Sequence, residues 1–273
     1  MLNSIKNKVY LASSPHLFAQ LFNIRGKLRG TGISCFFVES TQSYVVSDKT
    51  VTRLASRKYQ VMMYADGFSR RANSLFKTYL LDQLEFPTDA LIVDCGANVG
   101  DFYLALVTNI IQSFEYIAYE PSPLDFTCLA DNVKSIKGEV RLRQNALWNE
   151  SKKLVFFLHV ESASSSIIEP KTFNSRTMVS AVRLDEELFS TVFLIKVEAE
   201  GAEPEVLQGA IKLLPKTHYV VVDVGPERGK FEEVTRDAVV QFMNHQGFEI
   251  MRESDGNRRV VLFKNKRNLT LSK

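Results

Sequence analysis

The sequence predicts an α/β fold built around a mostly parallel β-sheet. From residue 89 onward, short apolar runs alternate with segments of helical periodicity, and such alternation is typical of βαβ units. The rhythm changes near the end of the chain, where two strand-like runs, 247–253 and 258–265, are separated only by Ser-Asp-Gly-Asn. Because Asp-Gly and Gly-Asn favour tight hairpin turns, the sheet is expected to finish in an antiparallel pair.

The chain is expected to divide into a small N-terminal cap, residues 1–67, and an α/β domain, residues 68–273. In the cap, PHLFAQLFNI fits a helix, while CFFVES and SYVVSD fit a short hairpin. The domain is expected to begin with a helix over residues 68–84, because the apolar residues there recur at helical spacing.

Five runs of the domain are predicted as strands of the sheet and four as its helices. The expected strands are 90–95, 114–120, 139–146, 191–198 and 217–224. The expected helices are 101–112, 123–136, 203–214 and 235–246. Within 152–184, two strand-like stretches flank a Ser-rich segment, which fits either an insertion over the ligand-binding edge of the sheet or a plain surface loop.

The composition is that of an ordinary folded protein, with 45% hydrophobic and 24% charged residues. No apolar run approaches the length of about 18 residues that spans a bilayer, and the first residues do not form a convincing signal peptide. The cysteines Cys35, Cys95 and Cys128 lie far apart without CxxC spacing, which indicates a reducing, cytoplasmic setting. Nucleic acid is not expected as a partner, because no aromatic-basic RNA-binding signature is present.

The stretch VDCGANVGDF, residues 93–102, joins the end of a strand to the start of a helix. Gly96 allows a tight turn, Asn98 tolerates a left-handed conformation, and Gly100 lets backbone or ligand approach the helix start. Exposed N–H groups there suit a polar or anionic ligand group. The spacing is not the GxGxxG of dinucleotide enzymes, because Ala97 and Asn98 replace the second glycine. Taken alone, the motif also fits a tight turn that holds no ligand.

Two later strand ends are expected at the same cleft. Glu120 ends the strand that follows, where a carboxylate is placed to accept hydrogen bonds from both hydroxyls of a ribose. Its structural alternative is an N-cap or surface role before two prolines. Asn145 and Ala146 follow the third strand, where an adenine edge would be recognised; an asparagine buried in a turn is the alternative there.

The strand over 191–198 carries unusual charge at its carboxyl end. Lys196 and Glu198 share one face of an otherwise apolar strand, and Glu200 and Glu203 follow closely. A central parallel strand is normally apolar on both faces, and buried charges are costly unless they are paired. On the structural interpretation, Lys196 and Glu198 pair with each other or cap the next helix, whose first turn favours Glu203 and Glu205. On the functional interpretation, the carboxylates orient or deprotonate a substrate hydroxyl at the ligand-binding edge.

Three blocks, VDCGANVGDF, YEPSP and IKVEAEGAEPEVLQGA, together resemble the FkbM family of S-adenosylmethionine-dependent methyltransferases. The resemblance covers about residues 89–265 and implies a class I methyltransferase fold, a Rossmann-like sheet of seven strands with an antiparallel last strand. It implies S-adenosylmethionine as cofactor and Glu120 as the ribose ligand. The expected loop contacts to the donor are Asp94, Gly96, Ala97, Asn98 and Gly100. The chain departs from the family at Glu198, where Asp is usual, and at Asp223, where many members carry Glu.

The family resemblance implies O-methylation, with a hydroxyl of a sugar, glycan or related natural product as the acceptor. The protein must then align the acceptor and remove its proton. The candidate catalytic residues are Lys196, Glu198, Glu200 and Glu203. His218, at a strand start, is interpreted as structural, and His159, beside the Ser-rich segment, is better placed. The carboxylates leave room for a divalent metal, although no His/Asp spacing demands one.

Two other interpretations stay open at this point. A nicotinamide-dependent dehydrogenase would share the ribose-binding acid, but it should carry the second glycine that Asn98 replaces. A non-catalytic module could bind a nucleotide or a glycan through the cap and its basic N-terminal segment, although it would tolerate loss of the charged strand end. The sequence identifies neither the acceptor nor whether the chain forms a homo-oligomer.

Overall fold

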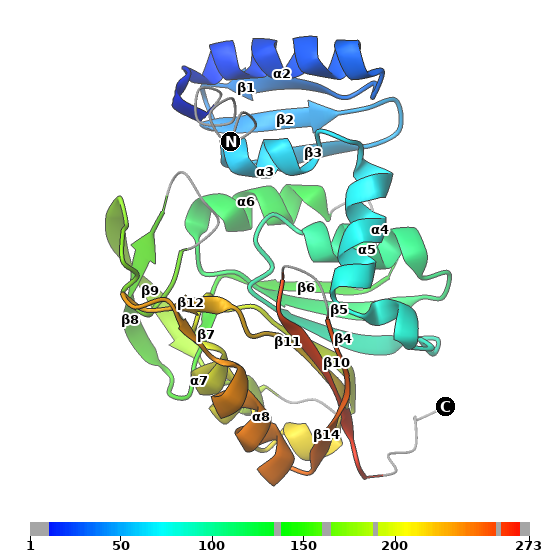
Figure 1. The fold of residues 1–273 in the computed structure, drawn as a ribbon, viewed down its shortest axis with the longest axis vertical. Coiled ribbons are helices and arrows are strands. Elements are labelled where there is room, and N and C mark those ends of the chain that lie inside the picture. Colours follow the sequence, from blue (N-terminus) through cyan, green and yellow to red (C-terminus); the bar gives the residue numbers. More distant parts are fainter. Residues whose placement is uncertain (1–10, 134–137, 160–164, 188–190, 255–257, 268–273) are drawn as a thin grey trace.

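A seven-stranded sheet forms the centre of the molecule (Figure 1). The computed structural model describes residues 11–133, 138–159, 165–187, 191–254 and 258–267. The strand order is β14-β15-β11-β10-β4-β5-β6. The strands are β4 (Ala90–Cys95), β5 (Phe114–Tyr119), β6 (Val140–Arg143), β10 (Val192–Val197), β11 (Thr217–Asp223), β14 (Phe248–Glu253) and β15 (Val260–Asn265). Only β15, the last strand in the sequence, runs antiparallel to its neighbours, which confirms the predicted sheet.

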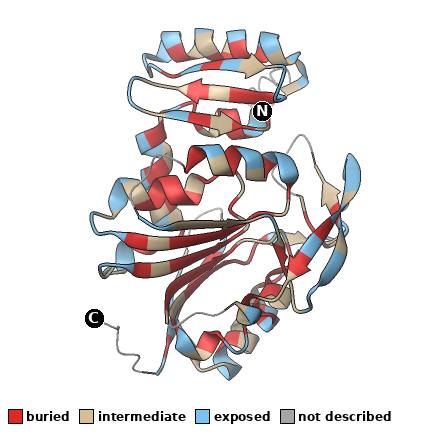
Figure 2. Ribbon diagram, turned by 180° about the vertical axis from the view of Figure 1, so that it is seen from behind, coloured by how far each residue is buried: buried red, intermediate tan, exposed pale blue. Residues whose placement is uncertain are grey.

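Helices cover both faces of this sheet, because its central strands are apolar on both sides. The helices are α4 (Phe68–Thr78), α5 (Asp101–Asn109), α6 (Pro123–Asn132), α7 (Glu203–Gln208) and α8 (Arg236–His245). Alternate residues of β4 illustrate the division: Ile92 packs toward α4, α5 and α6, whereas Val93 packs toward α7 and α8. Figure 2 shows the resulting buried strands between two partly exposed helical layers.

Three helices end earlier than the sequence predicts. The helix expected over 101–112 ends at Asn109, because Ile110 adopts an extended conformation. The helix expected over 68–84 stops at Thr78, because Leu80 adopts a left-handed conformation with φ of 58°, and a short 3-10 turn follows at Leu81–Gln83. The helix expected over 203–214 stops at Gln208. The next residue, Gly209, packs so closely against the carbonyl oxygen of Trp148 that a Cβ would lie 2.0 Å from it.

An N-terminal unit, residues 11–67, stacks on one end of the domain (Figure 1). It comprises α2 (Pro15–Arg29), β1 (Ser34–Val38), β2 (Ser43–Ser47), β3 (Thr52–Ala55) and α3 (Lys58–Met63). Helix α2 begins where Ser14 caps it ahead of Pro15 and ends at the left-handed Gly30. The expected helix and the β1–β2 hairpin are present, whereas β3 completes a three-stranded antiparallel sheet that the sequence pattern did not predict.

The stretch within 152–184 is an inserted sheet rather than a plain loop. Strands β8 (Lys152–Leu158) and β9 (Ser175–Val182) pair antiparallel, and the short β7 (Ala146–Leu147) joins β9 in parallel. A small β12–β13 hairpin (Pro226–Arg228 and Glu233–Val234) lies in the connection after β11. Within the described ranges, no helix is long and apolar enough to cross a membrane.

The N-terminal unit is fastened to the domain through buried polar contacts. Asn132 of α6 accepts a hydrogen bond from the backbone N–H of Leu54 at 2.6 Å and donates to the carbonyls of Leu54 and Val99 at 2.9 and 2.7 Å. Arg53, whose side chain is 2% exposed, donates to the same Val99 carbonyl at 2.9 Å. The side chains of Asn132 and Arg53 therefore connect the N-terminal unit to the domain by hydrogen bonds to backbone groups, although no described strand of the unit pairs with a strand of the central sheet.

We expect Asn132→Ala to lower the free energy of unfolding by about 1–3 kcal/mol, because it leaves buried backbone groups of β3 without partners. Urea denaturation measures the loss. Asn109→Ala is the matched control, since its amide donates only to Ala105 of its own helix. Equal losses in the two variants would contradict the fastening role.

Candidate active site

A cavity of about 510 Å³ opens at the carboxyl ends of β4, β5 and β10. This is the edge at which open α/β sheets bind their ligands. Most of the residues proposed from the sequence line it: Gly96, Ala97, Asn98, Glu120, Asn145, Ala146, Lys196, Glu198 and Glu200. The inserted sheet contributes Phe156, Ser165 and Ile167, so the insertion covers the ligand-binding edge.

The loop after β4 has the backbone that its glycines predict. Gly96 has a φ of 76°, and a Cβ there would lie 2.0 Å from the carbonyl oxygen of Glu198, so only glycine fits. Asn98 is left-handed with a φ of 49°, and its N–H donates to the Glu120 carboxylate at 2.7 Å. The loop and the end of β5 therefore form one hydrogen-bonded unit.

Glu120 is nearly fully buried at the cavity wall. Its second oxygen accepts the N–H of Ser122 at 2.8 Å. Burial and the nearby Asp125 raise the pKa of Glu120 to about 8, against the lowering effect of the two N–H donors. Each carboxylate oxygen retains a lone pair for a ligand, so the site fits a group with two adjacent hydroxyls.

Lys196 is buried beneath the cavity and is fully engaged. Its ammonium lies 2.9 Å from Asp94 and 3.0 Å from Glu198, and it donates to the carbonyls of Cys95 and Gly96 at 3.1 and 2.8 Å. Burial lowers the pKa of Lys196, but Asp94 and Tyr79 raise it above its ordinary value overall. The charged ammonium therefore holds β10 to the loop after β4.

Glu198 is held from three sides at the cavity wall. Besides Lys196, its carboxylate accepts a hydrogen bond from the hydroxyl of Tyr79 at 2.5 Å and forms an ion pair with Arg258. Arg258 also donates to Asp223, so one guanidinium bridges two carboxylates at the ends of β10 and β11. These three contacts fix the position of the Glu198 carboxylate.

Glu200 and Glu227 form a second carboxylate group at the cavity. Glu200 has a φ of 50°, a conformation that side chains rarely adopt, and such strain concentrates at functional sites. Burial and then the charge of Glu227 raise the pKa of Glu200, while burial and Asp223 raise that of Glu227 to about 8. The two residues also line a smaller cavity of about 160 Å³ with His159, so the cavities meet at this pair.

Three residues proposed from the sequence do not line the cavity. Asp94 is fully buried beneath it and pairs with Lys196. Gly100 starts α5, where a Cβ would meet a methyl of Leu129 at 3.1 Å. Glu203 is 1% exposed, and its carboxylate accepts two backbone N–H groups of the turn before α7 at 3.0 Å each. The Glu203 side chain therefore holds the turn before α7, and no side chain among the described residues caps that helix.

The two histidines also lie outside the main cavity. His218 is half-buried against Phe193, and burial lowers its pKa. His159 lines only the smaller cavity, where its Nε2 lies 3.4 Å from the hydroxyl of Thr172. Among the described residues, no group of three His, Cys, Asp or Glu side chains is arranged to hold a metal ion.

Several lining residues were missed by sequence reasoning. The N-terminal unit and α4 contribute Arg57, Gln60, Met63, Arg71, Leu75 and Tyr79, and the segments after β11 and before β15 contribute Glu227, Arg258 and Arg259. A helix was expected over 68–84, but nothing in its spacing indicated which residues would face a ligand. The hairpin signal at 254–257 predicted the antiparallel β14–β15 pair, which is present, while residues 255–257 of the turn lie outside the described residues. The signal did not indicate a role for Arg258.

The cavity fits the S-adenosylmethionine that the family resemblance implies. Glu120 could hold the ribose, and the apolar side chains of Ala146, Leu147 and Phe156 lie on the side where the adenine is expected. The carboxyl side chains of Glu198, Glu200 and Glu227, which also line the cavity, suit a positively charged sulfonium.

The raised pKa values predict that stability falls as the pH rises. The folded chain holds protons on Glu120 and Glu227 to about pH 8 and on Asp223 to about pH 6, whereas the unfolded chain releases them near pH 4. This stabilisation is complete below about pH 4 and is lost through pH 8. Over pH 5.5–8.5, we expect the free energy of unfolding of Glu227→Gln to fall by about 1–2 kcal/mol less than that of the wild type. Urea denaturation checks this; Glu232→Gln, exposed on the same hairpin, should behave as the wild type.

Comparisons with known proteins agree on one family. Residues 94–250 match the model of the methyltransferase FkbM domain. "Methyltransferase 1" of Beauveria bassiana is 30% identical over 181 residues, which cover 55% of this chain and 70% of that protein. "Methyltransferase sdnD" of Sordaria araneosa is 25% identical over 221 residues, 66% of this chain and 81% of that protein.

Among solved structures, the methyltransferase FkbM of Methylobacillus flagellatus aligns with a TM-score of 0.48 and 12% identity. The alignment covers 76% of this chain and 53% of that one, so the chain spans about half the length of that protein. The family match takes in more than half of the chain, including the loop after β4, Glu120 and the charged end of β10. The chain therefore belongs to the FkbM methyltransferase family and is an S-adenosylmethionine-dependent methyltransferase.

Proposed function

We propose that the chain methylates a hydroxyl oxygen and that the Glu200–Glu227 pair accepts the hydroxyl proton. The observation that carries this proposal is the pair itself, in which two glutamates of raised pKa border the donor cavity. A base whose pKa lies near neutrality is matched to removing a proton at physiological pH. Because burial and the charge of Glu227 both raise the pKa of Glu200, we expect Glu200 to stay protonated while Glu227 is ionised, and the ionised carboxylate accepts the hydroxyl proton.

We propose that the donor binds along the loop after β4, on the side away from Glu200 and Glu227. Glu120 then binds the ribose, and Asn145 and Ala146 lie beside the adenine. When bound, S-adenosylmethionine supplies an electrophilic methyl group for in-line displacement. The chain's own task is to align the acceptor oxygen and to take its proton. Lys196 and Glu198 contribute to the alignment by holding the cavity wall in place. The protonated ammonium of Lys196 pairs with Glu198, and Tyr79 and Arg258 also bind the Glu198 carboxylate.

The acceptor is proposed to be a polyhydroxylated molecule, such as a sugar, a glycan or a related natural product. The smaller cavity, which meets the donor cavity at Glu200 and Glu227, is lined largely by polar side chains, including His159, Ser166 and Thr172. Hydroxyl, imidazole and carboxylate groups pair well with the alternating donors and acceptors of a sugar. We propose that the acceptor enters through this cavity.

Glu120→Ala is expected to weaken S-adenosylmethionine and S-adenosylhomocysteine binding by about 10- to 100-fold, because it removes the hydrogen bonds to both ribose hydroxyls, each worth about 0.5–1.5 kcal/mol. Isothermal titration calorimetry measures both ligands, with NAD as the comparison. Glu115→Ala, on the same strand but paired with Arg141 away from the cavity, is the matched control. Unchanged affinity in Glu120→Ala would contradict the ribose assignment.

Glu200→Gln and Glu227→Gln are each expected to lower kcat by about 10²- to 10⁴-fold while leaving the affinity for S-adenosylhomocysteine nearly unchanged. The assay follows radiolabelled methyl transfer from S-adenosylmethionine to a panel of sugars, glycans and polyols, and then to compounds bearing carboxyl or amino groups. A methyl ether survives mild alkali, whereas a methyl ester does not. An alkali-labile product, or an amine as the sole acceptor, would overturn the hydroxyl proposal.

A further inference from the structure

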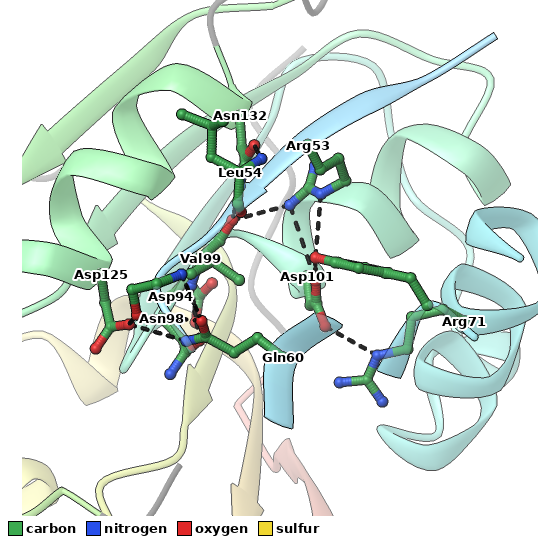
Figure 3. Close-up of polar contacts among 12 residues, drawn as sticks. Arg53, Leu54, Gln60, Arg71, Asp94, Asn98, Val99, Asp101, Asp125 and Asn132 are labelled. Carbon is green, nitrogen blue, oxygen red and sulfur yellow. Dashed lines mark hydrogen bonds and ion pairs between the residues drawn. The ribbon is translucent and has the colours of Figure 1, made fainter. Parts of the chain in front are cut away.

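Resting on the donor site proposed above, we propose that Arg71 binds the carboxylate at the amino-acid end of S-adenosylmethionine, and that Gln60 fixes the loop on which the donor lies. Both residues come from segments N-terminal to the residues that match the family model. Figure 3 shows them converging on the loop after β4 from α3 and α4.

Gln60 acts on the loop through a complete set of hydrogen bonds. Its amide nitrogen donates to the side chains of Asn98 and Asp125 at 2.7 and 2.8 Å. Its amide oxygen accepts the backbone N–H groups of Ser56 and Arg57 at 2.8 and 2.9 Å, which fixes the orientation of the side chain. Because the N–H of Asn98 in turn holds Glu120, Gln60 supports the proposed ribose ligand from the N-terminal unit.

Arg71 lies at the other end of the same loop and lines the cavity. Its Nε donates to Asp101 at 2.8 Å, and its side chain is 19% exposed. No residue in the described part of the chain accepts a hydrogen bond from its two terminal nitrogens. A guanidinium with a free pair of N–H groups is the side chain best shaped to bind a carboxylate.

The local charge balance also favours an anion beside Arg71. Asp101 is the acidic partner of two guanidiniums, since Arg53 lies 3.9 Å from it on the other side. The hydroxyl of Tyr64 donates to Asp101 as well, so the carboxylate is stabilised in its ionised form. Two positive charges and one negative charge leave an excess that an incoming carboxylate neutralises.

The position of Arg71 agrees with the direction in which the donor would lie. The proposed adenine wall is at β7 and the proposed ribose ligand at the end of β5, while Arg71, Leu75 and Tyr79 line the cavity along α4. A donor extended from β7 past the loop would thus bring its amino-acid end toward α4. Three other basic residues at the cavity wall already pair with carboxylates: Lys196 with Asp94, Arg57 with Asp125, and Arg258 with Glu198 and Asp223. Arg259 also lines the cavity, but it lies just before β15, which β11 and β10 separate from β4 and its loop.

The test compares two ligands that differ only at the proposed contact. S-Adenosylhomocysteine carries the amino-acid end, whereas 5′-methylthioadenosine keeps adenine, ribose and sulfur and lacks it. By calorimetry, we expect Arg71→Gln to weaken S-adenosylhomocysteine binding by about 10- to 100-fold and 5′-methylthioadenosine binding by less than about twofold. Arg71→Lys should recover part of the loss, because it restores the charge without the planar fork.

Gln60→Ala is expected to weaken both ligands by a similar factor, since it disturbs the ribose side of the site. Arg29→Gln is the matched control, because Arg29 forms an Arg–Asp ion pair with Asp66 outside the cavity. Equal weakening of both ligands in Arg71→Gln, or no weakening of S-adenosylhomocysteine, would overturn the role of Arg71. Wild-type protein that binds neither ligand would overturn the donor site and this proposal together, whereas failure of hydroxyl methylation alone would leave both standing.

Discussion

The buried ammonium of Lys196 is the contact on which the arrangement of the site depends. It joins the side chains of Asp94 and Glu198 to two carbonyls of the loop after β4, so a single charge fixes the ends of the two central strands relative to each other. Taking such a charge out of water is costly, and only a full set of partners compensates for it. Removing Lys196 would leave Asp94 buried without its counter-charge.

The same contact explains why residues from distant parts of the chain meet at one cavity. Glu198 is presented at a fixed position, and Tyr79 from α4 and Arg258 from the start of the last hairpin strand bind to it there. Tyr79 and Arg258 also stack, with the guanidinium 5.2 Å from the ring centroid. The wall around Glu198 is therefore organised by ionic contacts, whereas the wall around Glu120 is organised by backbone N–H groups of Asn98 and Ser122.

The sequence was sufficient to predict the sheet and the part of the site that lies at the ends of the strands, because those signals are local. Alternation of apolar runs gave the strands, and the glycines with Glu120 and Lys196 sit at strand ends where the fold brings them together. The part of the site formed by α3, α4 and the segment before β15 depends on contacts between residues far apart in the chain. Tyr79 and Glu198, for example, are 119 residues apart in the sequence. No local periodicity encodes such a pairing. The surroundings of the end of α7 are likewise non-local, since Gly209 packs against the carbonyl oxygen of Trp148, far away in the chain.

The late position of Arg258 in the chain bears on the order in which the site is completed during synthesis. Every acidic residue that it neutralises, Glu198 at the end of β10 and Asp223 at the end of β11, is made before it. Until β15 inserts between β11 and β14, the growing chain carries these carboxylates without their guanidinium, and the central sheet has an open edge at β11. Closure of the sheet and neutralisation of Glu198 and Asp223 are thus a single event, so a partly made chain would not display this finished wall of the cavity.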